Sequence, residues 1–286
     1  MEKRLAPAKV NLALDILGRR PDGYHELRSV MQTVSLCDTV ELVEGGEGFT
    51  LSMAGFTPPE GRKTLEQRAA EAFFARLGRA MPPLTVRITK RSPAYAGLGG
   101  GSADVAALLR LLRDAYAQDM ENAALETIGA EVGSDMPFCL RGGTALTEGR
   151  GELLTDLPAL PDCFLVLCKP PFPIPTPILF ARADSMAVRH RPDIPGMLEA
   201  LENRDLEGVA ARLGNVFEEL LPPEFCEVFV IRRALLEAGA LGASMSGSGP
   251  TVVGIFREED AARRAAASVG ARWRETFLAE PVGKLS

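Results

Sequence analysis

The sequence contains few of the side chains that bind zinc. Among its 286 residues are two histidines, His25 and His190, and five cysteines, none of them in a Cys-x-x-Cys pair. Zinc sites use closely spaced Cys and His ligands, and disulfide frameworks are typical of small secreted domains. We therefore expect neither, and we assign no role to His190. The cysteines, interpreted as reduced thiols, are Cys37, Cys139, Cys163, Cys168 and Cys226.

A long apolar run is also missing. The most apolar stretch, residues 164–180, is broken by Lys169 and by five prolines between Pro170 and Pro177. A membrane-spanning helix needs about 20 consecutive apolar residues, so this stretch predicts an interior strand followed by a proline-rich connection. The first residues contain no apolar run of the signal-peptide type. We expect a cytoplasmic protein without a membrane partner.

Basic residues are not in excess either. The chain has 32 basic and 38 acidic side chains, a net charge of -6, which gives no indication of a nucleic-acid partner. Phosphate binding is still compatible with this charge, because backbone N–H groups and a few local cations suffice for it. With 46% hydrophobic residues the chain can bury a substantial core.

The length suits two domains of ordinary size. Glycine, proline and charged residues cluster between Gly142 and Pro161, so we place a domain boundary there and expect domains at residues 1–152 and 153–286. Helical patterns and hairpin-like strands are mixed without strict βα alternation. This order predicts an α+β fold in both halves.

Residues 9–16 show the clearest strand pattern. Val10, Leu12, Leu14 and Ile16 alternate with other residues, which predicts a half-buried strand with Lys9 and the other odd-numbered positions on the non-core face. Further strands are predicted at Thr39–Val43, Gly48–Met53, Leu84–Lys90, Cys163–Cys168 and Thr251–Phe256, and helices at Thr64–Leu77, Ser102–Tyr116, Asn203–Leu213 and Glu224–Ala238. A second glycine-rich loop, Gly242–Gly249, is expected before the last of these strands.

The segment Gly97–Gly101 is rich in glycine and lies between a predicted strand and a predicted helix, with Ser102 expected at the helix N-cap. Glycines let the backbone approach an anion closely, and free N–H groups at a helix start attract it. The segment is not a P-loop, because no lysine follows the glycines, and it lacks the acidic partner of a dinucleotide-binding fingerprint. A purely structural turn is the alternative.

Residues 93–103, Pro-Ala-Tyr-Ala-Gly-Leu-Gly-Gly-Gly-Ser-Ala, resemble the ATP-binding signature of the GHMP kinase family. The triple glycine followed by Ser-x-Asp resembles the branch whose acceptor is 4-diphosphocytidyl-2-C-methyl-D-erythritol. Four more stretches agree with that branch and follow the family order: Ala6–Leu12, Arg20–Leu27, Gly133–Phe138 and Gly242–Pro250.

The resemblance implies a two-domain α+β architecture with the active site in the cleft between domains. It implies ATP as co-substrate with Mg²⁺, for which Ser102 is a candidate ligand, and phosphorylation of the acceptor's 2-hydroxyl in non-mevalonate isoprenoid synthesis. We expect a monomer or weak homodimer. The implied ATP-binding residues are Pro93, Ala94, Tyr95, Ala96, Gly97, Leu98, Gly99, Gly100, Gly101, Ser102 and Ala103.

By the same resemblance, Asp135 is the catalytic base and Lys9 keeps it ionised and orients the acceptor hydroxyl. The residues alone favour a capping or turn aspartate for Asp135 and a solvated surface lysine for Lys9. Asn11 is expected to hydrogen-bond the substrate from the same strand face as Lys9.

Tyr24 and His25 are implied to hold the cytidine base by stacking and polar contacts. Thr176 is a further candidate for substrate binding, and residues 244–249 resemble the segment that closes the site from the second domain. The alternative for Tyr24 and His25 is a loop aromatic packed on the surface. The alternative for residues 244–249 is a flexible turn before a strand.

A few positions depart from the family pattern. Ala103 replaces a second serine, Tyr95 is unusual in the approach to the glycines, Ser134 stands where alanine is common, and Pro175 stands where serine is common. None removes a catalytic group. Two other functions stay open: a GHMP kinase for mevalonate, a sugar or homoserine, and a nucleotide-binding regulatory protein on a kinase scaffold. Tyr24 and His25 favour the cytidyl acceptor over the first, and retention of both Lys9 and Asp135 argues against the second.

Overall fold

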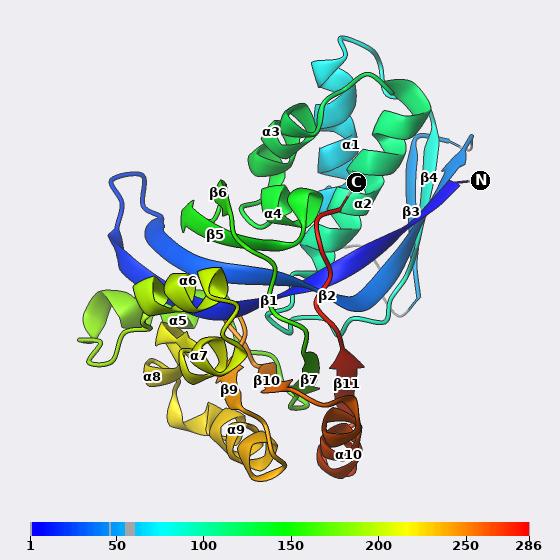
Figure 1. Cartoon of the computed structure of the whole chain (residues 1–286). Helices are drawn as coiled ribbons and strands as arrows, with labels where there is room; N and C mark the ends of the chain where they lie inside the picture. Colours follow the sequence, from blue (N-terminus) through cyan, green and yellow to red (C-terminus); the bar gives the residue numbers. More distant parts are fainter. Residues whose placement is uncertain (1, 46, 55–60, 286) are drawn as a thin grey trace.

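Two β-sheets and the helices packed on them form the protein, described by a computed structural model over residues 2–45, 47–54 and 61–285 (Figure 1). The larger sheet has seven strands, in the order β3-β4-β2-β1-β8, with β5 paired to β2 and β6 to β5. The smaller sheet has the order β11-β7-β10-β9. Helices α1 to α4 lie on one side of the larger sheet, and α5 to α10 lie with the smaller sheet on the other side. The predicted α+β class is confirmed.

The element bounds are as follows. The strands are β1 (Glu2–Arg19), β2 (His25–Glu44), β3 (Phe49–Met53), β4 (Leu84–Thr89), β5 (Thr144–Gly149), β6 (Leu153–Asp156), β7 (Phe164–Lys169), β8 (Gly214–Asn215), β9 (Gly242–Met245), β10 (Val252–Phe256) and β11 (Glu275–Ala279). The helices are α1 (Leu65–Arg76), α2 (Gly100–Tyr116), α3 (Asn122–Val132), α4 (Met136–Arg141), α5 (Thr176–Ser185), α6 (Ile194–Glu202), α7 (Leu206–Ala211), α8 (Val216–Glu219), α9 (Glu227–Glu237) and α10 (Glu259–Gly270), with a 3₁₀ turn η1 at Pro223–Phe225.

The antiparallel pair β1 and β2 crosses the whole width of the molecule (Figure 1). The predicted strands at residues 9–16 and 39–43 are only parts of these longer strands. Register shifts interrupt the pairing at three places, including the step from Asn11 to Ala13. An irregularity of this kind breaks the period-two alternation from which strand length is read.

Lys9 and Asn11 share one face of the strand, as expected, since Lys9 Nζ bonds Asn11 Oδ1, but this face is buried, and the expectation of a half-buried strand is wrong. Lys9 is 4% exposed and Asn11 2% exposed, because the middle of β1 is covered on both faces. Ala13, which the alternation placed on the same face as Lys9, joins the apolar cluster of Val10 and Leu12. The shift between Asn11 and Ala13 accounts for that change of side.

Three more boundaries differ from prediction. Helix α2 begins at Gly100 with Gly99 at the N-cap, so Ser102 lies in the first turn and does not cap it. Residues 203–205 do not belong to a helix of residues 203–213, because Asp205 caps α7 and a turn separates it from α6. Residues 242–245 form β9, so the loop before β10 is residues 246–251 only.

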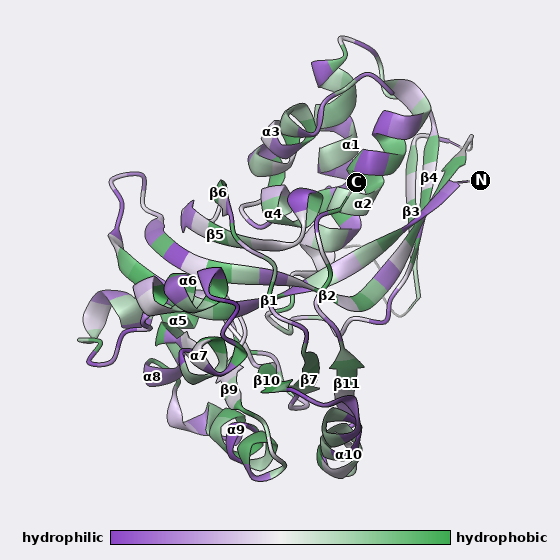
Figure 2. Cartoon of the chain, in the orientation of Figure 1, coloured by the Kyte–Doolittle hydropathy of each residue, from purple (hydrophilic) through white to green (hydrophobic). Residues whose placement is uncertain are grey.

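Buried apolar residues form three clusters, and the one that contains Val10 and Leu12 joins the two halves of the chain. It combines residues of β1 with residues of α6, β7 and β10. In Figure 2 the strands β7 and β10 are strongly hydrophobic, as expected for strands buried on both faces. The larger sheet is therefore held against the second half of the chain by burial of apolar surface.

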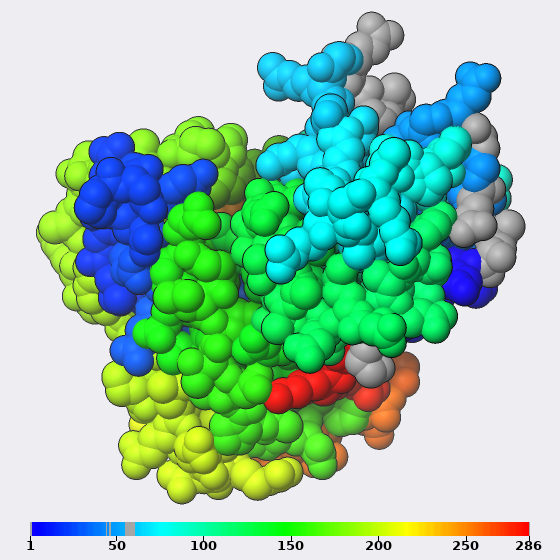
Figure 3. All heavy atoms as spheres, turned by 90° about the horizontal axis from the view of Figure 1, so that it is seen from above, coloured from blue at the N-terminus to red at the C-terminus, as the bar shows by residue number. Residues whose placement is uncertain are grey.

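The last residues return from the smaller sheet to the first half of the chain. After β11, Pro281 bridges to Val34 and Lys284 bridges to Gly142. In Figure 3 this red tail lies against green residues of the first half. Within the described ranges, every helix is too short or too polar to cross a bilayer.

Candidate active site

The glycine segment ends in a left-handed residue that starts α2. Gly99 has a φ of 65° and occupies the N-cap, so the N–H groups of the first α2 turn lack partners within the helix. A Cβ on Gly99 would lie 2.9 Å from Cγ of Lys9, which leaves room only for glycine. The result is a helix N-terminus suited to bind an anion, with a lysine side chain beside it.

The Lys9 side chain connects this helix start to Asp135. Its backbone N–H donates to the Leu98 carbonyl at 2.9 Å, and its Nζ lies 2.7 Å from Asn11 Oδ1 and 3.3 Å from Asp135 Oδ2. A buried ammonium requires such partners, because an unpaired buried charge is costly. The alternative of a solvated surface lysine is therefore wrong.

Asp135 occupies the N-cap position of α4 but does not act as a cap. Its backbone is helical, with φ −80° and ψ −11°, and within the described residues its side chain makes no capping hydrogen bond. The carboxylate is about one-third exposed, at 34%. The α4 residues that follow it are buried, as expected for a carboxylate at the edge of an apolar segment. A substrate hydroxyl could approach it from the solvent side.

Cys139 lies in α4 below Asp135 and is buried. Burial raises the pKa of its thiol to about 12, and the Asp135 charge contributes to the same shift. A thiol with this pKa stays protonated near neutral pH and is a poor nucleophile. Cys139 is therefore not a candidate nucleophile for this site.

Asn11 orients Lys9. Its Oδ1 accepts from Lys9 Nζ at 2.7 Å, and its Nδ2 donates to Ser29 Oγ at 2.8 Å. The Ser29 hydroxyl in turn donates to the Ala13 carbonyl at 2.6 Å. The side-chain oxygen of Asn11 is thereby engaged with the lysine, and β1 and β2 are linked at this point.

Tyr24 and His25 follow the β1–β2 turn and have different neighbours. Tyr24 is 55% exposed, and the Arg150 guanidinium lies 5.0 Å from its ring centroid. The His25 ring stacks on Phe180 at 4.6 Å, and its Nε2 lies 2.8 Å from Asp184 Oδ1. Figure 3 shows the blue turn residues against yellow-green residues that include α5. Arg150, Phe180 and Asp184 were not predicted, because they belong to no local motif.

The loop of residues 246–251 packs on the glycine segment. Ser246 Oγ donates to the Gly97 carbonyl at 2.9 Å and accepts from the Asn11 backbone N–H at 3.1 Å. A Cβ on Gly97 would overlap the Ser246 carbonyl oxygen. Farther along the loop, Ser248 Oγ lies 2.7 Å from Thr176 Oγ1, at the start of α5. The loop from the second half of the chain thus contacts Gly97 and Asn11 of the first half and the start of α5.

A buried ionic cluster that was not predicted lies beneath the glycines. Lys90 Nζ contacts the carboxylates of Asp38 and Asp104, both of them fully buried. Burial raises the pKa of Asp104 to about 7, although the Lys90 ammonium opposes this shift. For Asp38, burial is outweighed by hydrogen bonds from Lys90, Ser92 and backbone amides, which hold the pKa of that carboxyl below its usual value. The strand pattern around Asp38 indicated a strand but gave no sign of this pairing.

The approach to the glycines carries the unusual Tyr95. It has a φ of 52°, which is uncommon for a residue with a side chain, and it is 78% exposed. Ala103, the second departure, is buried in the first half's core. A serine at position 103 would place its hydroxyl in that core and not at the surface of the helix start.

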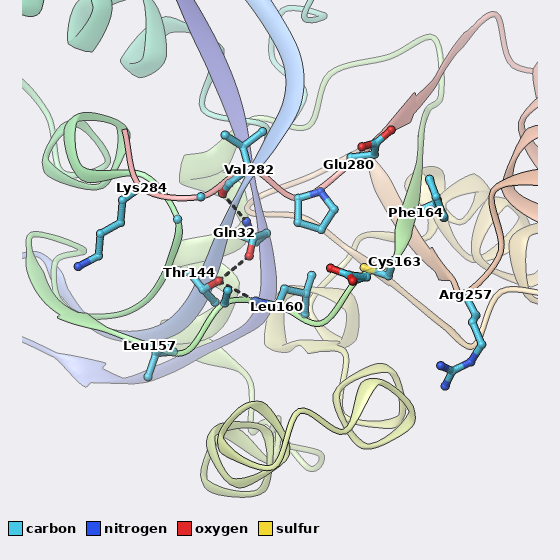
Figure 4. Close-up of a pocket in the computed structure, with 15 residues that line it drawn as sticks. Gln32, Thr144, Leu157, Leu160, Cys163, Phe164, Arg257, Glu280, Val282 and Lys284 are labelled. Atoms are coloured by element: carbon cyan, nitrogen blue, oxygen red, sulfur yellow. Dashed lines mark hydrogen bonds between the residues drawn. The ribbon is translucent and has the colours of Figure 1, made fainter. Parts of the chain in front are cut away.

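A cavity of about 620 Å³ lies apart from these residues, beside the C-terminal tail. Figure 4 shows Gln32 at its wall, joined by hydrogen bonds to Thr144 and to the Val282 carbonyl. The polar groups of Gln32 are satisfied by the protein itself. We assign the cavity to the seam between the tail and the larger sheet.

The donor set near the glycines contains few metal ligands. Among the described residues, no group of three His, Cys, Asp or Glu side chains could hold a metal ion. The Ser102 side chain in the first α2 turn and the Asp135 carboxylate are the oxygen donors at hand. Such a set suits Mg²⁺ only where phosphates and water supply the other ligands.

Comparisons with known proteins agree with the sequence resemblance. The family model "GHMP kinases N terminal domain" matches residues 64–143, and "GHMP kinases C terminal" matches residues 197–275. The chain is similar to the 4-diphosphocytidyl-2-C-methyl-D-erythritol kinase of Pelotomaculum thermopropionicum, with 42% identity over 95% of this chain and 93% of that protein. The protein of the same name from Geobacter sulfurreducens is 41% identical over 93% of this chain and 94% of its own length.

Solved structures extend this result to the fold. A crystal structure of 4-(cytidine 5'-diphospho)-2C-methyl-D-erythritol kinase superposes with a TM-score of 0.81 at 33% identity, over 99% of this chain and 100% of the other. A homoserine kinase from Cytophaga hutchinsonii has a TM-score of 0.75 at 19% identity, over 99% of this chain and 94% of the other. At that identity the second likeness shows a common fold alone.

Proposed function

The chain belongs to the 4-diphosphocytidyl-2-C-methyl-D-erythritol kinases of the GHMP kinase family, and we propose that Lys9 and Asp135 carry out its chemistry. The reaction transfers the terminal phosphoryl group of ATP to the 2-hydroxyl of 4-diphosphocytidyl-2-C-methyl-D-erythritol. The products are the 2-phosphate and ADP, in the non-mevalonate route to isoprenoid precursors.

The ATP phosphates bind at the start of α2 in this proposal. The free N–H groups after Gly99 point outward from the helix and carry the positive end of its dipole. The Lys9 side chain passes beside this helix start, with its Cγ 2.9 Å and its Cε 3.0 Å from where a Gly99 Cβ would be, and it carries a positive charge at its end. This placement supports nucleotide contacts by the residues at the start of α2, whereas Ala96, Leu98 and Ala103 are buried and would act by shaping the segment.

One observation carries the proposed chemistry: the Lys9 side chain extends from Gly99 to Asp135, with its Nζ 3.3 Å from the carboxylate. A nucleotide at the helix start and an acceptor at Asp135 would therefore meet at Lys9. The acceptor oxygen attacks the terminal phosphorus, the bond to the ADP oxygen breaks, and the hydroxyl proton passes to Asp135. Lys9 pairs with the carboxylate and stabilises the charge that develops on the transferred group.

The cytidyl acceptor is held between the β1–β2 turn and α5. The exposed Tyr24 ring offers a face for the cytosine, and His25 offers a polar ring edge. Arg150 places a positive charge beside Tyr24, which suits the diphosphate of the acceptor. Thr176, at the start of α5, bonds Ser248 of the loop of residues 246–251. Asn11 acts on the acceptor indirectly, because it holds Lys9 in place.

Mg²⁺ is part of this proposal and is held mainly by the phosphates. Ser102 and Asp135 are the side chains that would complete its shell, since no dense carboxylate cluster is present among the described residues. When bound, the ion neutralises phosphate charge during transfer. Every proton step remains with Asp135.

We also propose a division of the chain near the predicted boundary. Strand β6 pairs with β5, so a boundary after Asp156 keeps that hairpin whole, whereas one after residue 152 divides it. A boundary after Asp156 also lies between the two family-model matches.

A monomer or weak homodimer in the cytoplasm, without a nucleic-acid or membrane partner, stays a prediction that sedimentation and cell fractionation can check.

The proposal is tested by measuring ADP release with a panel of acceptors. The cytidyl compound should support turnover, while mevalonate, homoserine and simple sugars should not, because they have no base for Tyr24 and His25 to hold. Turnover of mevalonate with an inert cytidyl compound would overturn the acceptor assignment. ATP binding without ADP release for any acceptor would point to a regulatory protein instead.

A further inference from the structure

The loop of residues 246–251 is held from behind by a side chain that the proposed reaction does not use. Asn215, the last residue of β8, donates both hydrogens of its Nδ2, to the Met245 carbonyl at 2.7 Å and to the Gly247 carbonyl at 2.8 Å. Its Oδ1 accepts from the Phe217 N–H at 2.9 Å and so caps α8. Both donors of the amide and its oxygen are thus engaged in holding the loop and capping α8.

A second side chain of the same segment holds the strand that leads into the loop. Glu218 Oε1 accepts from the Met245 N–H at 2.6 Å and from Ser244 Oγ at 2.9 Å. Its other oxygen pairs with Arg232 at 3.2 Å. Residues 215–218 therefore fix the end of β9 and the first turn of the loop together.

The front of the loop contacts the glycine segment directly. Ser246 Oγ donates to the Gly97 carbonyl at 2.9 Å and accepts from the Asn11 N–H at 3.1 Å. A Cβ on Gly247 would lie 2.9 Å from the Gly97 carbonyl oxygen, so the two backbones touch. A displacement of the loop would therefore be passed to Gly97 by contact.

We propose that Asn215 is a positioning residue for ATP: through the Gly247 carbonyl it sets where the loop presses on Gly97, and so where the amides at the start of α2 lie. The residue is suited to this because it is only 7% exposed and its strand pairs with β1 at Leu14. It thus joins the loop to the strand that carries Lys9. The inference rests on the proposed role of residues 97–102 in holding the nucleotide.

The test variant is Asn215→Asp. Aspartate has the same shape and still caps α8, but its oxygen faces two carbonyl oxygens in place of the two donors. The KM for ATP should rise roughly tenfold, and more than the KM for the acceptor. The defect should shrink as pH falls from 8 to 6, because a protonated carboxyl regains one donor. In Asn215→Ala the KM for ATP should also rise, but the ratio of its KM to that of the parent protein should stay the same between pH 8 and pH 6.

The matched control is Asp205→Ala. Asp205 caps α7 by accepting from the Gly208 N–H at 2.9 Å. Within the described part of the chain, α7 makes no hydrogen bond to Gly97 or to the loop of residues 246–251. Losing that cap should lower the unfolding temperature and leave the KM for ATP unchanged. An unchanged KM in Asn215→Asp, or an equal rise in Asp205→Ala, would overturn the inference.

Binding of a non-hydrolysable ATP analogue, measured by calorimetry, separates this inference from the assigned reaction. The dissociation constant should follow the order of the ATP KM values across the three variants. If the parent protein binds the analogue tightly but turns over no acceptor, the reaction assignment fails and Asn215 is still tested by binding. If all variants bind it equally, the inference about Asn215 fails whatever the acceptor.

Discussion

Lys9 and Asp135 form an asymmetric ion pair. The lysine is buried, whereas about a third of the aspartate side chain is exposed. Removing the aspartate charge leaves a buried ammonium with Asn11 as its hydrogen-bond partner, which is costly to the folded protein. Removing the lysine charge instead leaves a carboxylate that water can solvate. Effects on activity and on stability must therefore be measured separately for each residue.

Asp135→Asn should lower kcat by about 10²- to 10⁴-fold, because the acceptor hydroxyl loses the group that takes its proton. The measurement is ADP release at saturating ATP and acceptor. Asp119→Asn, in the exposed turn after α2, removes a carboxylate far from the glycines and should keep normal turnover. Near-normal turnover in Asp135→Asn would remove Asp135 from this role.

A Lys9→Met variant and the double variant with Asp135→Asn extend this test. If the two residues act as one unit on the hydroxyl, the double variant should be about as slow as the slower single variant. Fully multiplicative losses would mean that the two side chains contribute independently, in conflict with their 3.3 Å pairing.

Asp104 gives stability a pH dependence of its own. Its pKa is about 7 in the folded protein and about 3.9 in an unfolded chain, so the folded state binds more protons between these values. The free energy of unfolding that it contributes is present below about pH 4 and is lost as pH rises through about 7. Asp104→Asn should remove this component.

Relative to Asp104→Asn, the parent protein should lose on the order of 2 kcal/mol of unfolding free energy between pH 5 and pH 8. Urea denaturation at both pH values provides the measurement. Asp119→Asn serves again as the comparison and should track the parent protein. Parallel curves for the parent protein and Asp104→Asn would contradict the raised pKa.

At the scale of elements, the glycine segment is defined by what surrounds it. Gly97 touches the loop of residues 246–251, Gly99 touches Lys9, and Gly100 lies against Ser92 and Lys90. Gly101, by contrast, has only a Leu65 methyl at 4.0 Å from its Cβ position. Three of the four glycines thus have a close neighbour that restricts a side chain, whereas Gly101 has none, although all four form one motif in the sequence.

Gly97→Ala and Gly101→Ala make a matched pair of variants. At Gly97 the φ of 74° and the overlap with the Ser246 carbonyl should lower the free energy of unfolding by at least about 2 kcal/mol. At Gly101, inside α2, alanine should raise it by about 0.5–1 kcal/mol. Chemical denaturation distinguishes them, and equal destabilisation would mean that the loop contact contributes little.

At the scale of the whole molecule, two neighbouring segments of the chain connect its two halves. The first crossing is the connection of residues 157–163 and the second is the tail after β11. Both meet at Thr144, whose hydroxyl donates to Gln32 and accepts from the Leu160 N–H, while Gln32 donates to the Val282 carbonyl (Figure 4). The tail also reaches α4 through a 2.9 Å bond from the Leu285 N–H to the Arg141 carbonyl.

Removal of residues 281–286 should lower the free energy of unfolding by about 2–4 kcal/mol, because it leaves the buried Gln32 amide and backbone carbonyls without their partners. Urea denaturation measures the loss. Lys284→Ala breaks only an exposed pair with Asp156 and should cost less than about 1 kcal/mol. A truncated protein as stable as the parent would show that the seam is not held by the tail.

Sequence patterns determined the elements whose reasons are local. The α2 stripe, the apolar strand β7 and the glycine run follow from periodicity, burial and backbone freedom, all of which depend on neighbours in sequence. The family motifs predicted Lys9, the glycines and Asp135 as parts of one site, because each motif is a short contiguous stretch. The length of β1 and β2 could not be read in this way, since irregular register breaks the alternation.

Only the tertiary structure decided what depends on residues far apart in sequence. It buried Lys9 by covering both faces of β1, it paired Lys90 with Asp38 and Asp104, and it placed the Gly247 carbonyl between Asn215 and Gly97. Such contacts join residues separated by up to 150 positions, as between Gly97 and Gly247, and their side chains carry no periodic signal. Burial and pairing arise when the two halves pack together, so no local pattern could contain them.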